Sequence, residues 1–364
     1  MRRITILTEQ PEKELWEKIL QYSYKARIQK YFAMNGIEPG EKSDMLSETI
    51  ICSLLQANEY YRLSRDASLH TAPLLLYYGT INLFLGASTL LSGKDFSING
   101  HGMKVNICKD VSEIGATTIH FVSPKDGGIN VFAGQIESQD YSLMDLQTFS
   151  LREMLLSIPE INLEALQCYG ESDNYCIPLE TIRTEDGVIE RVIFSGHDHK
   201  AIAAMLSRIP AFSTSYLNPS FVDRKDNTIV TLRHKYMQDP ICYSSITEQS
   251  YLLIGHIHGE KLIVLPQWVY MYASLFGMAT LCRYHPYLWN PFIRLDEKGE
   301  RLLVEKFINI ARRKLPNIIL NRIENCEYSF ENRKYVPENQ VKVLGEHEVK
   351  DLVREEIIRK DMNR

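Results

Sequence analysis

The sequence lacks a disulfide framework. Its seven cysteines are an odd, scattered set among 364 residues, and none belongs to a C-x-x-C pair. Domains that depend on disulfides carry even numbers of cysteines at close spacings. The cysteines are therefore expected to be free thiols, which predicts a protein of the reducing cytoplasm.

A strong charge of either sign is also missing. The formal net charge is −5 at pH 7, and 24% of the residues are charged. A protein that attracts nucleic acid through its overall field needs an excess of lysine and arginine. Any contact with nucleic acid must therefore come from a local basic patch.

No long apolar run is free of polar residues. The most apolar window, residues 72–91, is long enough to span a bilayer but contains Tyr77, Tyr78 and Asn82. The apolar run near the N-terminus, residues 4–7, is too short for a signal peptide. We expect a buried helix of a soluble protein, with no membrane partner.

The motifs of nucleotide cofactors and common hydrolases are absent. The sequence has no G-x-G-x-x-G after a strand, no Walker A loop, no H-E-x-x-H and no G-x-S-x-G. No cofactor is therefore predicted.

Apolar residues at helical spacing are present near both ends of the chain. They predict helices over residues 11–33, 43–65, 71–91, 267–284 and 296–315, with a short helical piece through residue 323 after Pro316. In the middle, short β-branched and aromatic runs alternate with turns. They predict strands at 117–122, 129–132, 188–194, 228–232 and 250–257, and one helix at 142–157.

The simplest assembly of these elements is an α+β fold. Residues 1–99 and 266–330 would pack together as a split helical bundle, because their apolar helices match. Residues 100–265 would form an inserted β-rich domain with helical excursions. Residues 331–364 form a charged tail, with a terminal helix predicted at 346–364.

Two helical segments resemble a known family. Residues 70–87 read HTAPLLLYYGTINLFLGA, and residues 275–289 read LFGMATLCRYHPYLW. The first is similar to the "PLLLYYG…NL" helix of YaaC-like proteins, and the second to the "LARY-P-x-x-W" helix end of the same family. The resemblance runs in order from about Tyr60 to Asn321.

A second resemblance lies at Arg65 and His70, which fit the R-polar-x-x-x-H pattern of HEPN ribonucleases. Those proteins are helical bundles in which the arginine steadies phosphate and the histidine transfers a proton during attack by the ribose 2′-hydroxyl. The resemblance implies an HEPN-like bundle and a metal-independent endoribonuclease or toxin-like effector. It would act on RNA in bacterial stress or phage defence and form a homodimer, with Arg65 and His70 as catalytic residues.

The alternative reading of the same residues is structural. Arg65 would pair with Glu59 or Asp66 at a helix junction. The protein would then be a non-catalytic interaction or scaffold subunit that dimerises or docks a partner through its bundle. An exposed, electropositive cleft shared by Arg65 and His70 would favour the enzyme.

Gly-His-x-His is found twice, at residues 196–199 and 255–258. Side chains at i and i+2 of a strand share a face, so each pair offers two imidazoles to one metal ion. The candidate ligands are His197, His199, His256 and His258. The alternative is that both segments are polar turns, and since nothing else completes a metal signature, no metal is predicted.

Three further residues are candidates for substrate binding. His101 stands between Gly100 and Gly102, and Arg283 and Tyr284 begin an aromatic cluster that suits stacking on a base or a clamp on phosphate. The alternatives are a tight domain junction at the glycines and a bulky core closure at the helix end.

Overall fold

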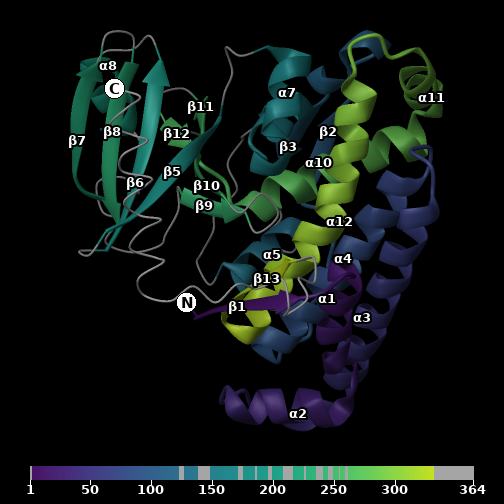
Figure 1. The fold of residues 1–364 in the computed structure, drawn as a ribbon. Coiled ribbons are helices and arrows are strands. Elements are labelled where there is room, and N and C mark those ends of the chain that lie inside the picture. The colour runs from purple at the N-terminus through teal and green to yellow at the C-terminus, as the bar shows by residue number, and fades with distance from the viewer. Residues whose placement is uncertain are drawn as a thin grey trace, which may run out of the picture.

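The protein has an α+β fold, as predicted (Figure 1). The computed structural model describes residues 2–122, 127–137, 148–170, 175–184, 187–195, 199–207, 216–224, 227–234, 241–244, 249–253, 255–258 and 261–331. Long helices from both ends of the chain lie together, and a separate antiparallel sheet stands beside them.

Four helices make up the N-terminal part of the chain. They are α1 (Pro11–Leu20), α2 (Lys25–Met34), α3 (Ser43–Asp66) and α4 (Ala72–Ser92). The single helix predicted over residues 11–33 is wrong, because a 3₁₀ turn (Gln21–Ser23) and an extended Tyr24 separate α1 from α2. The Ser23 hydroxyl donates to the Leu20 carbonyl at 2.7 Å, and a hydroxyl bonded to the local backbone in this way competes with helix continuation.

The C-terminal helices are α10 (Gln267–Tyr284), α11 (Pro286–Leu295) and α12 (Glu300–Glu324). The helix predicted to end before Pro316 instead runs through it. A proline inside a helix costs about 3 kcal/mol. The burial of Leu315, Ile319 and Leu320 on the core side of α12 offsets that cost.

The central element is α4, which packs against α3, α10, α12 and α5 (Gly128–Ile136). Helices from both ends of the chain therefore share one hydrophobic core. Leu83, Phe276, Met278 and Leu281 of α4 and α10 are buried there. Leu74, Leu75 and Tyr78 of α4 are only half-buried.

A three-stranded antiparallel sheet covers part of this core. Its strands are β2 (Met103–Asn106), β3 (Thr118–Phe121) and β4 (Thr148–Ser150). The strand predicted at 117–122 is confirmed by β3. The strand predicted at 129–132 is wrong: it belongs to α5, whose residues Ile129, Phe132, Ala133 and Ile136 are buried at helical spacing.

Of the helix predicted at 142–157, residues 142–147 lie outside the described residues, 148–150 form β4, and only α6 (Leu151–Leu156) is confirmed as helix. Ser150 caps α6 through a capping box with Glu153, which stops β4 and starts the helix at that residue. A 3₁₀ turn (Pro159–Ile161) and α7 (Asn162–Tyr169) follow. Two more 3₁₀ turns lie at Gly40–Lys42 and Val111–Ala116.

The larger sheet has the strand order β7-β8-β6-β5-β10-β9. Its strands are β5 (Cys176–Thr184), β6 (Gly187–Ser195), β7 (Tyr216–Arg224), β8 (Asn227–His234), β9 (Ile241–Ser244) and β10 (Gln249–Leu253). The strands predicted at 188–194 and 228–232 are confirmed.

The strand predicted at 250–257 is divided between β10 and β11 (His256–His258). Strand β11 pairs with β12 (Lys261–Ile263) in a separate two-stranded sheet. Helix α8 (His199–Ser207) follows β6.

The two ends of the described chain meet in a parallel pair. Strand β1 (Arg2–Leu7) lies beside β13 (Cys326–Glu331), with Arg2 opposite Cys326. Local sequence patterns do not predict this pair, because the partners stand more than three hundred residues apart. The helix predicted at 346–364 lies outside the described residues.

The packing of α4 predicts that truncating two neighbouring leucines lowers the free energy of unfolding by unequal amounts. Leu76 is fully buried and Leu75 is half-buried. Leu76→Ala should lower the free energy of unfolding by about 2–5 kcal/mol, and Leu75→Ala by clearly less. Urea unfolding followed by circular dichroism checks this, and equal losses would contradict the burial of Leu76 in the core.

Candidate functional site

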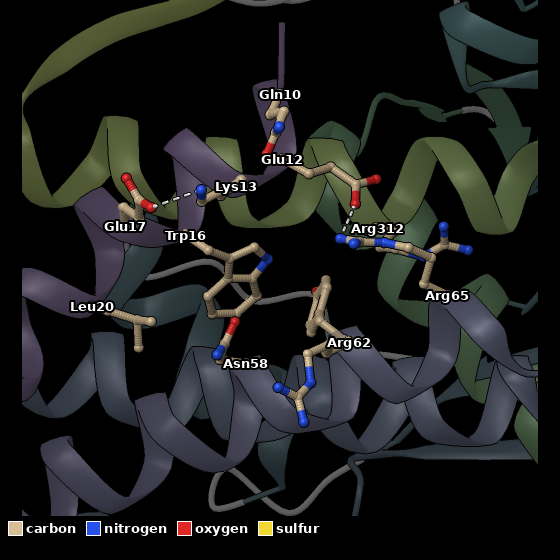
Figure 2. Close-up of a pocket in the computed structure, with 11 residues that line it drawn as sticks. Gln10, Glu12, Lys13, Trp16, Glu17, Leu20, Asn58, Arg62, Arg65 and Arg312 are labelled. Atoms are coloured by element: carbon tan, nitrogen blue, oxygen red, sulfur yellow. Dashed lines mark hydrogen bonds and ion pairs between the residues drawn. The ribbon is translucent and has the colours of Figure 1, made fainter. Parts of the chain in front are cut away.

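A pocket lies where α1, α3 and α12 meet (Figure 2). Its volume is about 270 Å³. It is lined by Gln10, Glu12, Lys13, Trp16, Glu17, Leu20, Asn58, Tyr61, Arg62, Arg65 and Arg312. We call it the Arg65 pocket. Four of its side chains are basic and two are acidic, so the pocket supplies the local positive charge that the whole chain lacks.

Glu12 is the acidic residue nearest the centre of this charge. Its Oε2 accepts a bond from Arg65 Nη2 at 2.6 Å, and Figure 2 shows it reaching from α1 toward the guanidinium groups. Arg65 is exposed and pairs with neither Glu59 nor Asp66; Glu59 pairs with Arg62 instead. The predicted local ion pair is therefore wrong in its partner, because α1 folds back across the end of α3.

Arg312 is the second guanidinium of the pocket and is only 8% exposed. Its Nη2 donates to Asn309 Oδ1 at 3.0 Å, whereas its Nε has no hydrogen-bond partner among the described residues. Burial and the charge of Arg65 lower the pKa of Arg312, and Glu12 raises it. The group stays protonated at neutral pH, because an arginine pKa starts above 12.

The basic trio Arg312-Arg313-Lys314 is not a solvated helix face, because each of its members is bonded within the fold. Arg313 donates to the Phe330 carbonyl at 2.7 Å. Lys314 is buried and pairs with Glu160 at 2.7 Å. Only Arg312 of the three lines the Arg65 pocket.

His70 lies on the turn between α3 and α4, outside the lining of the Arg65 pocket. The side chain is exposed, and its Nδ1 shares a 2.8 Å hydrogen bond with Asn290 Oδ1 of α11. The Trp289 indole donates to the Leu69 carbonyl at 2.9 Å. The turn is thus anchored on α11, and Arg65 and His70 have separate partners.

The three predicted substrate-binding residues gather around two tyrosines of α4. His101 Nδ1 shares a 2.8 Å hydrogen bond with the Tyr77 hydroxyl. Arg283 donates to the Tyr78 hydroxyl, and its guanidinium lies 4.8 Å from the ring centre of Tyr284. We define the aromatic corner as Tyr77, Tyr78, His101, Arg283, Tyr284 and Tyr287.

The backbone at His101 depends on its two glycines. Gly100 and Gly102 have φ values of 80° and 72°, which side chains with a Cβ rarely adopt. The turn they form lets the His101 carbonyl accept from the Ile129 amide at 3.2 Å. The ring then rests 4.9 Å from Phe276, and partial burial, followed by the charge of Arg283, lowers the pKa of His101.

Of the four candidate metal ligands, His256 alone has a described side chain. It is buried, its Nε2 shares a 2.7 Å hydrogen bond with the Ser157 hydroxyl, and its ring lies 4.1 Å from that of Tyr175. His197 lies outside the described residues, and the side chains of His199 and His258 are not described. Within the described part of the chain, no group of three or more His, Cys, Asp or Glu could hold a metal ion.

The family model for YaaC-like proteins matches residues 19–323, which include the end of α1, all of α3 and α4, the aromatic corner and nearly all of α12. The chain belongs to the YaaC-like family. No curated protein and no solved structure matches it. Of the Arg65 pocket, the YaaC-like match takes in Leu20, Asn58, Tyr61, Arg62, Arg65 and Arg312.

The YaaC-like resemblance in the sequence pointed to α4 and to the end of α10, but not to the pocket. Glu12, Trp16 and Arg312 were missed as site residues, because α1 and α12 meet Arg65 of α3 only through tertiary packing. The only sequence signal was the basic trio on α12. The apolar window that raised the membrane question is α4, and 61% of it is buried inside the fold, as expected for a core helix.

The Arg65 pocket predicts that Glu12 competes with anions. Glu12→Gln should raise the affinity for inorganic pyrophosphate roughly three- to tenfold, because a partly solvated opposing charge is worth on the order of 1 kcal/mol. Isothermal titration calorimetry measures the change. The matched control is Glu14→Gln, which removes the same charge from α1 outside the pocket lining; equal effects of both variants would refute a specific role of Glu12.

The aromatic corner predicts that Arg283 holds down the pKa of His101. Arg283→Gln should raise that pKa toward the ordinary value of about 6.5, as followed by NMR of the imidazole. The folded-state pKa lies below the unfolded value, so His101 stabilises the fold above pH ~6.5, and this stability is lost as the pH falls. Arg294→Gln, an exposed arginine of α11, should leave the titration unchanged.

Proposed function

We propose that this protein binds RNA, with the Arg65 pocket as its phosphate site. The observation that carries the proposal is the pair of guanidinium groups at the pocket, Arg65, which pairs with Glu12, and Arg312, which pairs with no carboxylate among the described residues. A guanidinium presents a planar fork of donors that matches the oxygens of a phosphate.

A chain of phosphates suits the pocket better than a single small anion. Arg62 and Lys13 stand exposed at its edge, where they pair with Glu59 and Glu17. Exposed ion pairs of this kind contribute little, so a polyanion can displace them. Trp16 and Asn58 line the same cavity and offer a ring edge and an amide to a base or ribose. A polyanion gains from each added cation through the release of its counterions.

Metal-independent cleavage of that RNA is the second candidate. In this proposal α3, α4, α10 and α12 form an HEPN-like bundle, Arg65 holds the scissile phosphate and His70 transfers the proton. The support is that both side chains are exposed and flank the α3–α4 turn. Asn290 Oδ1 accepts the hydrogen bond from Nδ1 of His70, so Nε2 is the nitrogen that would exchange protons with substrate. Such an activity would suit an effector of bacterial stress or phage defence.

The binding proposal predicts the behaviour of an arginine variant. Arg65→Gln should weaken binding of a fluorescein-labelled single-stranded RNA about tenfold, the loss of one charged hydrogen bond, and reduce the salt slope by about one. Fluorescence anisotropy over a salt series measures both. Arg301→Gln, which removes an arginine paired with Glu305 outside the pocket, is the control; no difference between the variants would contradict the proposal.

Cleavage is tested separately on the same RNA in the presence of EDTA. If His70 transfers a proton, His70→Ala abolishes product while binding stays near the wild-type value. Product formation should then fall on both sides of an optimum pH. Intact RNA with the wild-type protein would remove the nuclease proposal and leave RNA binding through the bundle.

A further inference from the structure

The surface where α10 turns into α11 carries aromatic rings that the core does not use. Tyr284 is 60% exposed and Tyr287 is 65% exposed, whereas their neighbours Leu288 and Trp289 are buried. His285 shares a 3.2 Å hydrogen bond with the Tyr287 hydroxyl and lies edge-on to its ring. Large exposed rings on a rigid helix corner mark a contact surface.

Arg283 supplies positive charge to the same surface. It is exposed, and no carboxylate pairs with it among the described residues. One of its nitrogens donates to Tyr78, which positions the guanidinium over the ring of Tyr284. A guanidinium stacked on a tyrosine ring, with donors left over, suits a ligand that has both flat rings and negative charge.

The aromatic corner and the Arg65 pocket lie at the same end of the α3–α4 hairpin. Arg65 stands on the last turn of α3, and the following turn is bonded to α11 through Leu69 and His70. In Figure 1, α11 lies at this end of the long helices. The two sites are therefore joined along the chain by the turn that carries the exposed His70.

From this arrangement we infer that the aromatic corner is a base-stacking platform for unpaired RNA, so that the ligand of the Arg65 pocket is single-stranded. This inference rests on the proposed function of that pocket. Tyr284 and Tyr287 stack on bases, and Arg283 bonds the adjoining phosphate. Unpaired bases expose the faces that such rings need, whereas the stacked bases of a duplex do not.

The test compares two ligands of equal length, a single-stranded RNA and the same ribose-phosphate chain without bases. Wild-type protein should bind the base-bearing strand roughly tenfold more tightly, on the order of one stacked base. Tyr284→Ala should abolish this preference, and Tyr284→Phe should keep it, because the ring alone is needed. Circular dichroism shows whether each variant is folded.

The remaining outcomes separate the corner from the pocket. If wild type binds both ligands equally and Tyr284→Ala changes nothing, while Arg65→Gln weakens both, the corner inference is overturned and the pocket proposal stands. If Arg65→Gln has no effect and Tyr284→Ala removes binding, the pocket proposal fails and the platform stands.

If no RNA binds to the wild-type protein, both the pocket proposal and the corner inference fail. Loss of a self-associated species in Tyr284→Ala, with RNA binding unchanged, would assign the corner to protein contacts and overturn the inference.

Discussion

The close packing of α3 against α4 is the constraint on which the other sites depend. A Cβ at Gly79 would lie 2.8 Å from the ring of Tyr61, and one at Gly86 would lie 3.1 Å from Ser53, so both glycines let the helices approach. The Tyr61 hydroxyl then reaches Thr80 at 2.9 Å. Tyr61 is a wall of the Arg65 pocket, and Tyr78, one residue before Gly79, holds Arg283 at the aromatic corner.

The buried ion pair of Lys314 and Glu160 sets the rotation of α12. Glu160 also accepts a bond from Gln267 at 2.9 Å, which joins α12, the 159–161 turn and the start of α10. Two residues along an α-helix turn through about 200°, so Arg312 points to the opposite side of α12 from Lys314. Because Glu160 holds Lys314 in the interior, Arg312 faces α1 and α3, where the pocket forms.

Helical periodicity predicted α3, α4 and α10 correctly because each has many apolar residues at fixed spacing. It failed at Ile129–Phe132, where a four-residue run with three apolar residues suits a strand and a helix equally. The site was harder: Arg65 and Arg283 were singled out from local motifs, but Glu12 and Arg312 became neighbours of Arg65 only through tertiary packing. The pairing of β1 with β13 joins the far ends of the described chain and has no local signal at all.

The central claim is that RNA runs from the Arg65 pocket to the aromatic corner. Photo-crosslinking of a single-stranded RNA that carries 4-thiouridine, followed by peptide mass spectrometry, tests it most directly, since it reports the place of contact without altering the protein. Adducts are expected on α1, on the C-terminal half of α3 and on residues 283–290. Adducts confined to the six-stranded sheet, or to α2, would contradict it.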